Sequence, residues 1–171
     1  MRFSIIEGDI TLQAVDAIVN AANTTLLGGG GVDGAIHRAA GPGLLAECRT
    51  LHGCASGQAK ITGGYRLPAR YVIHTPGPVW HGGLQGESDL LRSCYQSCLT
   101  LAVEHSCQTV DFPSISTGVY RFPLDKAAPL AVETICSFLD SHPELSRVRM
   151  VCFDPVTKHA YEKALREYLG R

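Results

Sequence analysis

An unbroken apolar run at Ala17–Val19 is followed a few residues later by four consecutive glycines, Gly28–Gly31, and then by a segment of helical character, Val32–Ala40. A short run that is apolar on both faces suits an interior strand covered by helices on each side. Glycines lose more backbone entropy on folding than other residues, so four in a row need a use such as close approach to a ligand. The order of strand, glycine loop and helix therefore predicts an α/β protein with a binding loop after an interior strand.

The rest of the chain alternates short strand-like runs with amphipathic segments. Strands are expected at 3–7, 17–19, 58–62, 71–75, 110–113 and 148–153, and helices at 32–40, 44–48, 87–107, 125–139 and 156–169. In the helix at 125–139, Pro129 is expected near the first turn, where proline costs no hydrogen bond. This alternation predicts an α/β sheet covered on both faces, and the length of 171 residues suits one domain spanning 1–171.

Charge and hydropathy exclude several classes of partner. Fifteen Lys and Arg stand against sixteen Asp and Glu, and no run of five like charges occurs, so no direct nucleic-acid footprint is expected. No eighteen apolar residues run together, and the N-terminus meets Glu7 before an apolar segment can form. We therefore expect neither a membrane span nor a secretion signal.

Seven cysteines form an odd set on a chain that is large enough to fold without disulfides. No pair is spaced C-x-x-C, and Cys94 and Cys98 lie one helical turn apart on an apolar stripe. We interpret them as reduced core thiols of a cytoplasmic protein, and we expect no metal. We also expect the protein to be a monomer.

Two loops rich in small residues have the composition of anion sites. The amides of Gly30, Gly31 and Val32 would open a helix, whose N-terminus presents N–H groups to an anion. The second loop, Ser116–Tyr120, follows another predicted strand and adds hydroxyl donors. Two such loops could close on one diphosphate, although two ordinary turns would have the same composition. No lysine follows a glycine, so the chain has no Walker A loop.

Several polar residues beside these loops allow both a structural and a functional interpretation. Asp33 suits a helix cap as well as a catalytic acid beside an anion site. Asn20 and Asn23 follow the predicted buried strand, where asparagine either satisfies the turn or holds sugar hydroxyls. Asp9 by default is a turn residue, and His37 a helix-surface residue.

Taken in order, five segments resemble the macrodomain family, and within it the MacroD-type branch that hydrolyses ADP-ribose esters. These segments are Gly8–Thr11, Ala17–Asn23, Gly28–His37, Val72–Thr75 and Phe112–Tyr120. The resemblance implies a three-layer α/β/α fold with a mixed central sheet. It also implies a hydrolase that needs no cofactor and acts on ADP-ribosylated proteins, at acidic side chains, and on O-acetyl-ADP-ribose.

The resemblance also assigns roles to individual residues. Asp9 and Ile10 would hold the adenine, with Phe153 as a stacking partner, while Asn20 and Asp33 would serve catalysis at the distal ribose. The residues that would bind the remainder of the ligand are Asn23, Gly30, Gly31, Val32, Ser116, Thr117, Gly118, Val119 and Tyr120.

Two departures from the family pattern concern turnover. Arg121 stands where glycine is common, and Pro76 interrupts a His-Thr-Val-Gly-Pro motif. Two other functions stay open: an ADP-ribose-binding module without catalysis, and a nicotinamide-dependent oxidoreductase. The second rests on Gly29–Gly34, which satisfies G-x-G-x-x-G, but the chain is too short for a separate substrate domain.

Overall fold

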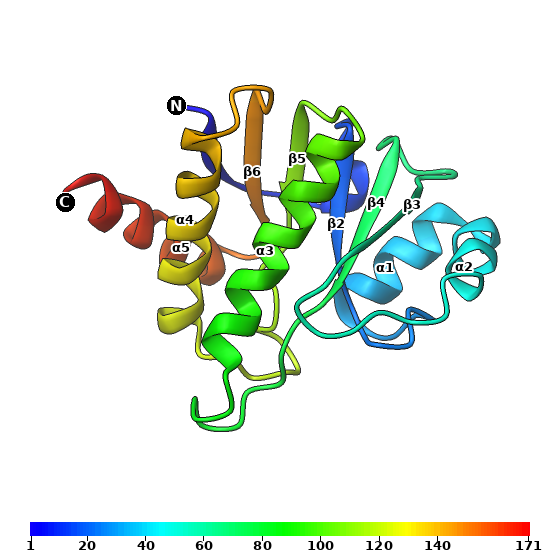
Figure 1. Ribbon diagram of the computed structural model, residues 1–171, viewed down its shortest axis with the longest axis horizontal. Coiled ribbons are helices and arrows are strands. Elements are labelled where there is room, and N and C mark those ends of the chain that lie inside the picture. The colour runs from blue at the N-terminus through cyan, green and yellow to red at the C-terminus, as the bar shows by residue number, and fades with distance from the viewer.

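A twisted six-stranded sheet forms the middle layer of the molecule in the computed structural model, which describes all 171 residues (Figure 1). Its strands are β1 (Phe3–Glu7), β2 (Ala17–Ala22), β3 (Lys60–Gly63), β4 (Tyr71–Pro76), β5 (Thr109–Phe112) and β6 (Arg147–Cys152). The spatial order is β1-β6-β5-β2-β4-β3, with all neighbours parallel except β3, which pairs antiparallel with β4 at the edge. The mixed central sheet is therefore confirmed.

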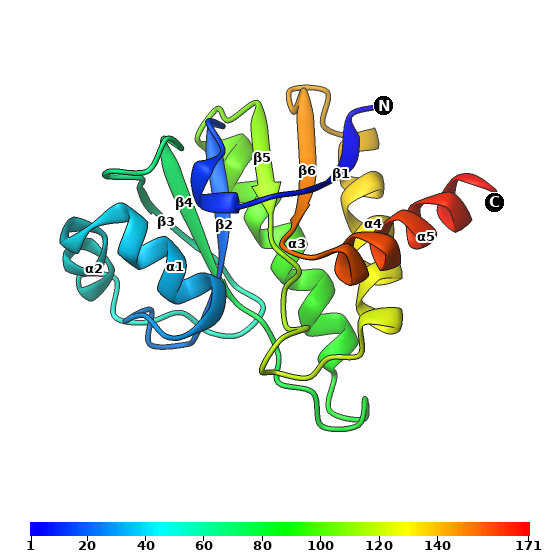
Figure 2. The same ribbon diagram turned by 180° about the vertical axis from the view of Figure 1, so that it is seen from behind.

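Helices cover both faces of this sheet. They are α1 (Gly31–Ala40), α2 (Pro42–Arg49), α3 (Glu87–Glu104), α4 (Leu124–Asp140) and α5 (Pro155–Leu169), with a short 3₁₀ turn, η1, at Ile10–Leu12. Successive residues of a strand point to opposite faces, so Val19 of β2 joins a core with α3, α4 and α5 while Ile18 joins one with α1 and α2. Figure 1 shows α3 and α4 in front of the sheet, and Figure 2 shows α1 in front of the opposite face. The three-layer α/β/α fold is confirmed.

The predicted elements are all present, with a few shifted boundaries. The strand expected at 58–62 begins at Lys60, and the helix expected to reach Cys107 ends at Glu104. Pro129 is the sixth residue of α4, just beyond the first turn near which it was expected. The Asp125 carbonyl four residues earlier consequently lacks its helical N–H partner.

The cysteines and the apolar segments show no sign of cross-linking or membrane insertion. All seven cysteines are buried free thiols, as expected for Cys94 and Cys98 on the buried stripe of α3. The structure contains no group of three or more His, Cys, Asp or Glu side chains placed to hold a metal ion. No helix combines the length and hydropathy that a membrane span requires.

The parallel strands bring five loops to one edge of the sheet. Parallel strands share their carboxyl edge, so the segments that follow β1, β6, β5, β2 and β4 lie beside one another in that order. Asp9 follows β1 and Phe153 follows β6. The segment Ser114–Tyr120, which we call the serine-rich loop, follows β5, and the glycine loop follows β2. Residues far apart in the sequence are thereby aligned along a single edge, which is where open α/β sheets bind ligands.

Candidate functional site

The glycine loop presents free backbone amides at the N-terminus of α1. Gly30 is the N-cap and makes no side-chain cap bond, and Gly31 has φ +58°, a left-handed conformation that glycine adopts without strain. The amides of Gly30, Gly31 and Val32 donate to no acceptor within the protein. Three free N–H groups at the positive end of a helix dipole favour a negatively charged ligand, which is the kind of ligand that the sequence predicts for this loop.

Asn23 fixes the shape of this loop from within. Its Nδ2 donates to the Gly28 carbonyl at 2.8 Å, and its Oδ1 accepts from the amides of Thr25 and Leu26, both at 3.1 Å. This is the turn-forming role of asparagine. Asn23 therefore shapes the end of the site through the backbone, with every polar atom of its side chain engaged inside the loop.

The serine-rich loop after β5 presents a second row of free amides. None of the backbone N–H groups of residues 116–120 donates to an acceptor within the protein. Ser116 has φ +67° and so lies in the left-handed region, whereas Gly118, the glycine of this loop, is outside it. The buried Ser116, not the exposed glycine, carries the backbone strain of the turn.

The hydroxyl groups of Ser114 and Thr117 are bonded within the protein and hold this loop to the core. Ser114 Oγ lies 2.6 Å from Thr117 Oγ1 and 2.7 Å from the hydroxyl of Tyr161, a buried residue of α5. The Tyr120 carbonyl accepts from the Trp80 amide at 2.8 Å, which ties the loop to the segment after β4. The Ser116 hydroxyl is buried without a hydrogen-bond partner in the protein.

A buried polar cluster lies where the two loops meet the sheet. Asn20 is inside β2, not after it, and its even position turns its side chain toward α1. Its Nδ2 donates to Asp33 Oδ1 at 2.9 Å and lies 3.2 Å from His74 Nδ1. All three residues are at least 95% buried. Asp33 makes no cap bond, so the capping interpretation of this residue is wrong.

His74 fixes the orientation of the Asn20 amide. Asn20 and His74 are paired in register across β2 and β4, and Thr62 Oγ1 lies 2.9 Å from His74 Nε2. Burial, and to a smaller extent the electrostatic effect of His37, lower the pKa of His74 to about 3, so the ring is neutral. A neutral ring with its proton on Nε2 donates to Thr62 and accepts from Asn20 at Nδ1. Asn20 Oδ1 is then left without a partner in the protein.

Two histidines at this site were not predicted to have a role. His37 Nε2 lies 3.4 Å from Asp33 Oδ1, one helical turn away, without hydrogen-bond geometry. The spacing of Asp33 and His37 was a signal for this contact, since residues four apart share a helix face. His74 gave no such signal, because its contact with Asn20 depends on the order of the strands.

The residues expected at the adenine end lie together at the other end of the edge. Asp9 is exposed, and its Oδ1 caps η1 by accepting from the Thr11 amide at 2.9 Å, which leaves Oδ2 free. The Gly8 amide donates to the Cys152 carbonyl at 2.8 Å, which brings Asp9 beside Phe153. The ring of Phe153 is 82% exposed, so one face of it is open for stacking.

A buried ion pair supports this end of the site. Arg149 donates to both carboxylate oxygens of the fully buried Asp111, at 2.9 and 2.7 Å, and to Gln13 Oε1 at 3.2 Å. Gln13 in turn donates to the Asp9 carbonyl at 3.0 Å. The strands thus position Asp9 through a chain of hydrogen bonds, and Ile10 is buried beneath it.

The fold and this candidate site define an α/β protein with two rows of free backbone amides at the carboxyl edge of its sheet. A model of the Macro domain matches residues 19–131. A macro domain-containing protein of Lactiplantibacillus plantarum is 61% identical over 166 residues, which cover 96% of each chain. The chain belongs to the macro domain family.

Two further relatives carry informative names. Human ADP-ribose glycohydrolase MACROD2 is 53% identical over 171 residues, covering 99% of this chain and 40% of that protein. The Trypanosoma brucei macrodomain in complex with ADP-ribose has a TM-score of 0.91 at 46% identity, covering 96% of this chain and 69% of that one. The Oceanobacillus iheyensis macrodomain with ADP has a TM-score of 0.93 at 41% identity, covering 97% and 90%.

Proposed function

We propose that this protein binds ADP-ribose along the carboxyl edge of its sheet. The two rows of free amides follow β2 and β5, which are neighbours in the sheet, so one diphosphate would receive donors from both sides. The free Oδ2 of Asp9 would accept from the adenine amino group, and Phe153 would stack on the base. The similarity to macrodomains with ADP and with ADP-ribose supports ADP-ribose as the ligand.

We further propose that the protein hydrolyses esters of ADP-ribose. The observation that carries this proposal is the buried pair of Asn20 and Asp33, held 2.9 Å apart beside the glycine loop. A carboxylate and an amide in fixed geometry at the distal ribose suit positioning of water and of sugar hydroxyls. The substrates would be ADP-ribose on acidic protein side chains and O-acetyl-ADP-ribose. The named glycohydrolase activity of MACROD2 supports hydrolysis.

In this proposal each member of the cluster has a distinct task. Asn20 Oδ1, which has no partner in the protein, accepts a hydrogen bond from a distal ribose hydroxyl. Asp33 assists the water that attacks at the distal ribose, by taking its proton or by holding it in place. His74 keeps the Asn20 amide from rotating, and Tyr120 closes over the ribose.

Other features of the proposal concern turnover and setting. Arg121 has φ +63°, so it holds a left-handed position that glycine adopts without strain, and its amide closes a turn on the Gly118 carbonyl at 2.9 Å. This turn would slow closure of Tyr120 over the ligand.

We also propose that the protein acts as a monomer in the cytoplasm on ADP-ribosylated proteins, without a cofactor.

Two measurements on the wild-type protein and Asp33→Ala test the proposal. Calorimetric titration with ADP-ribose should give binding to both proteins within about tenfold, because Asp33 is one of many contacts and a factor of ten is about 1.4 kcal/mol. Release of ADP-ribose from a peptide modified on glutamate should be strong for wild type and weak for the variant. Binding by wild type without release would leave a binding module, and full activity of Asp33→Ala would contradict the catalytic role.

A further inference from the structure

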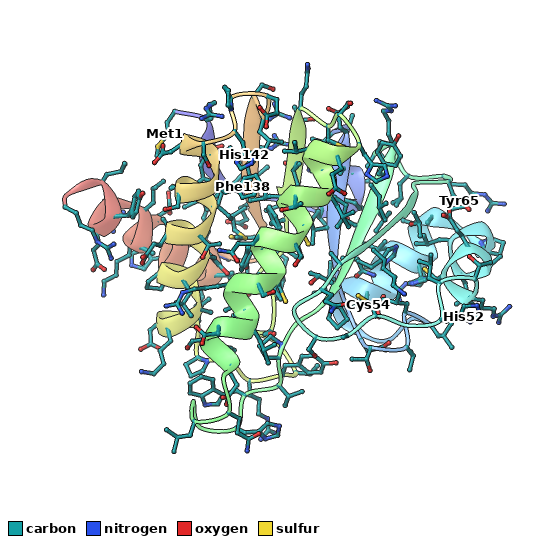
Figure 3. The ribbon with its side chains drawn as sticks, viewed as in Figure 1. Met1, His52, Cys54, Tyr65, Phe138 and His142 are labelled. Atoms are coloured by element: carbon teal, nitrogen blue, oxygen red, sulfur yellow. The ribbon has the colours of Figure 1, made fainter.

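Two shallow pockets of about 390 and 490 Å³ lie beside the glycine loop and the helices α1 and α2, and Leu27 lines both of them. The larger is lined by Gly28, Gly29, His37 and Arg38, and the smaller by Arg49 and His52 among others. His52, labelled in Figure 3, lies on the loop after α2. We call this surface, with the adjoining Arg66, the arginine groove.

The arginine groove gathers positive charge that the protein does not neutralise. No aspartate or glutamate lines either pocket. Arg38, Arg49 and Arg66 are exposed, and none of them has a carboxylate within 4.0 Å. Arg66 borders the larger pocket, because Gly41 lines that pocket and a Cβ atom added to Gly41 would lie 3.2 Å from the guanidinium carbon of Arg66. Three unpaired guanidinium groups therefore surround one groove.

Arg38 brings this charge to the glycine loop itself. Its Nη1 lies 3.0 Å from the Cβ position of Gly34, and the Gly29 carbonyl oxygen lies 2.5 Å from the same point. A side chain at Gly34 would push the guanidinium away. The Cβ position of Gly29 is in turn 3.1 Å from Asp33 Oδ2. The groove thus begins one residue from the carboxylate that we place at the distal ribose.

We propose that the arginine groove binds acidic residues flanking the ADP-ribosylated side chain of a protein substrate. This inference rests on the proposed function, because the distal ribose is where the protein chain would be attached. A chain leaving that ribose past the glycine loop meets Arg38 first, then Arg49 or Arg66. Guanidinium groups bind carboxylates through paired hydrogen bonds, which makes aspartate and glutamate the matching flanking residues.

The extent of the charge favours an acidic peptide over a nucleic acid. The cations are confined to two small pockets, whereas the chain as a whole has a net charge of −1. Binding of a phosphate backbone depends on a broad positive face.

O-acetyl-ADP-ribose carries an acetyl group at the position of the protein chain, so it would not reach the groove. The groove therefore adds selectivity among protein substrates alone.

The test compares two glutamate-ADP-ribosylated peptides that differ only in their flanks, aspartates in one and asparagines in the other. For the double variant Arg38→Glu/Arg49→Glu, kcat/KM on the acidic peptide should fall by about tenfold, since two reversed exposed pairs at roughly 0.2–1 kcal/mol each reach this range. The loss should appear in KM, because the contact is the same in the ground and transition states. Activity on the asparagine peptide and on O-acetyl-ADP-ribose should change less than about twofold.

Arg166→Glu is the matched control, because Arg166 is an exposed arginine on α5 that forms no ion pair. It should leave the ratio between the two peptides unchanged. Equal losses on both peptides, or none on the acidic one, would overturn the inference. Fluorescence anisotropy with a labelled single-stranded oligonucleotide adds one more outcome: binding that the double variant loses would assign the groove to nucleic acid and overturn it too.

Failure of the proposed function would look different. If wild type releases no ADP-ribose from either peptide, hydrolysis is wrong, and the comparison is then made by calorimetric affinity for the two modified peptides. Wild type should bind the acidic peptide more tightly, and the double variant should lose that preference. Equal affinities of wild type for both peptides would overturn the role of the groove.

Discussion

Gly77, directly after β4, is the glycine whose replacement should most specifically disturb the ligand crevice. A Cβ at this position would lie 2.1 Å from Ser116 Oγ and 2.6 Å from Ile115 Cγ2, both in the segment after β5. Ordinary contacts begin near 3.4 Å, so these atoms would have to withdraw by roughly 1 Å. Ile115 is fully buried and has no free space to move into. Gly77→Ala should therefore displace the second row of amides.

The expected magnitudes follow from that displacement. Overpacking of this kind costs about 1–3 kcal/mol, which for a chain of this size lowers Tm by roughly 3–10 °C. A displacement of about 1 Å in a positioned group can cost up to about 10²-fold, so we expect ADP-ribose affinity to fall by roughly 10- to 100-fold. Calorimetric titration measures the affinity, and thermal unfolding followed by circular dichroism measures the stability.

Gly118→Ala is the control within the same loop. Nothing lies within 4 Å of its Cβ position and its φ is outside the left-handed region, so stability and binding should stay near wild type. The double variant Gly77→Ala/Ser116→Gly should recover part of the affinity, since it removes the closest contact and glycine tolerates the φ of +67° at residue 116. Normal ADP-ribose affinity in a folded Gly77→Ala would refute the reasoning.

Three other changes have defined outcomes. Asp9→Ala should weaken ADP-ribose binding and reduce selectivity for adenine, because the free carboxylate oxygen is lost; unchanged affinity and base preference would show that Asp9 only caps η1. Gly118→Glu should fold, because the residue is exposed with open space around it. It should lose ADP-ribose binding, because the new side chain is bulky and its negative charge repels the diphosphate. An ADP-ribose affinity near that of the wild-type protein would remove this loop from the site. The free energy of unfolding of the wild-type protein should fall as the pH drops from about 6.5 towards 3, by about 1.4 kcal/mol per pH unit from His74 alone. The reason is that the pKa of His74 is about 3 in the folded protein and 6.5 in the unfolded chain, so the unfolded chain binds the extra proton in this range. Urea denaturation across this range should show a shallower dependence for His74→Gln, and parallel curves would contradict a neutral buried ring.

The short-range features of this protein were predictable from its sequence. The apolar run of β2, the glycine loop and the start of α1 are neighbours in the chain, and the periods of strands and helices are local properties. The order of motifs from Gly8 to Tyr120 was enough to indicate the macrodomain family and, through it, Asn20 and Asp33. These two residues are 13 positions apart, within one strand–loop–helix unit, so their contact needs no knowledge of the sheet order.

The remaining features depend on how strands are ordered and how loops meet. His74 contacts Asn20 across 54 residues only because β2 and β4 are neighbours in register, and periodicity does not fix that pairing. The left-handed residue of the loop after β5 is Ser116 and not Gly118, and Ile115 and Ser116 pack closely against Gly77 of another segment. The arginine groove likewise joins residues of α1, α2, the loop before α1, the loop after α2 and the segment after β3. Local chemistry therefore predicted which residues we propose to react with or bind a ligand, whereas contacts between distant segments decided how those residues are held.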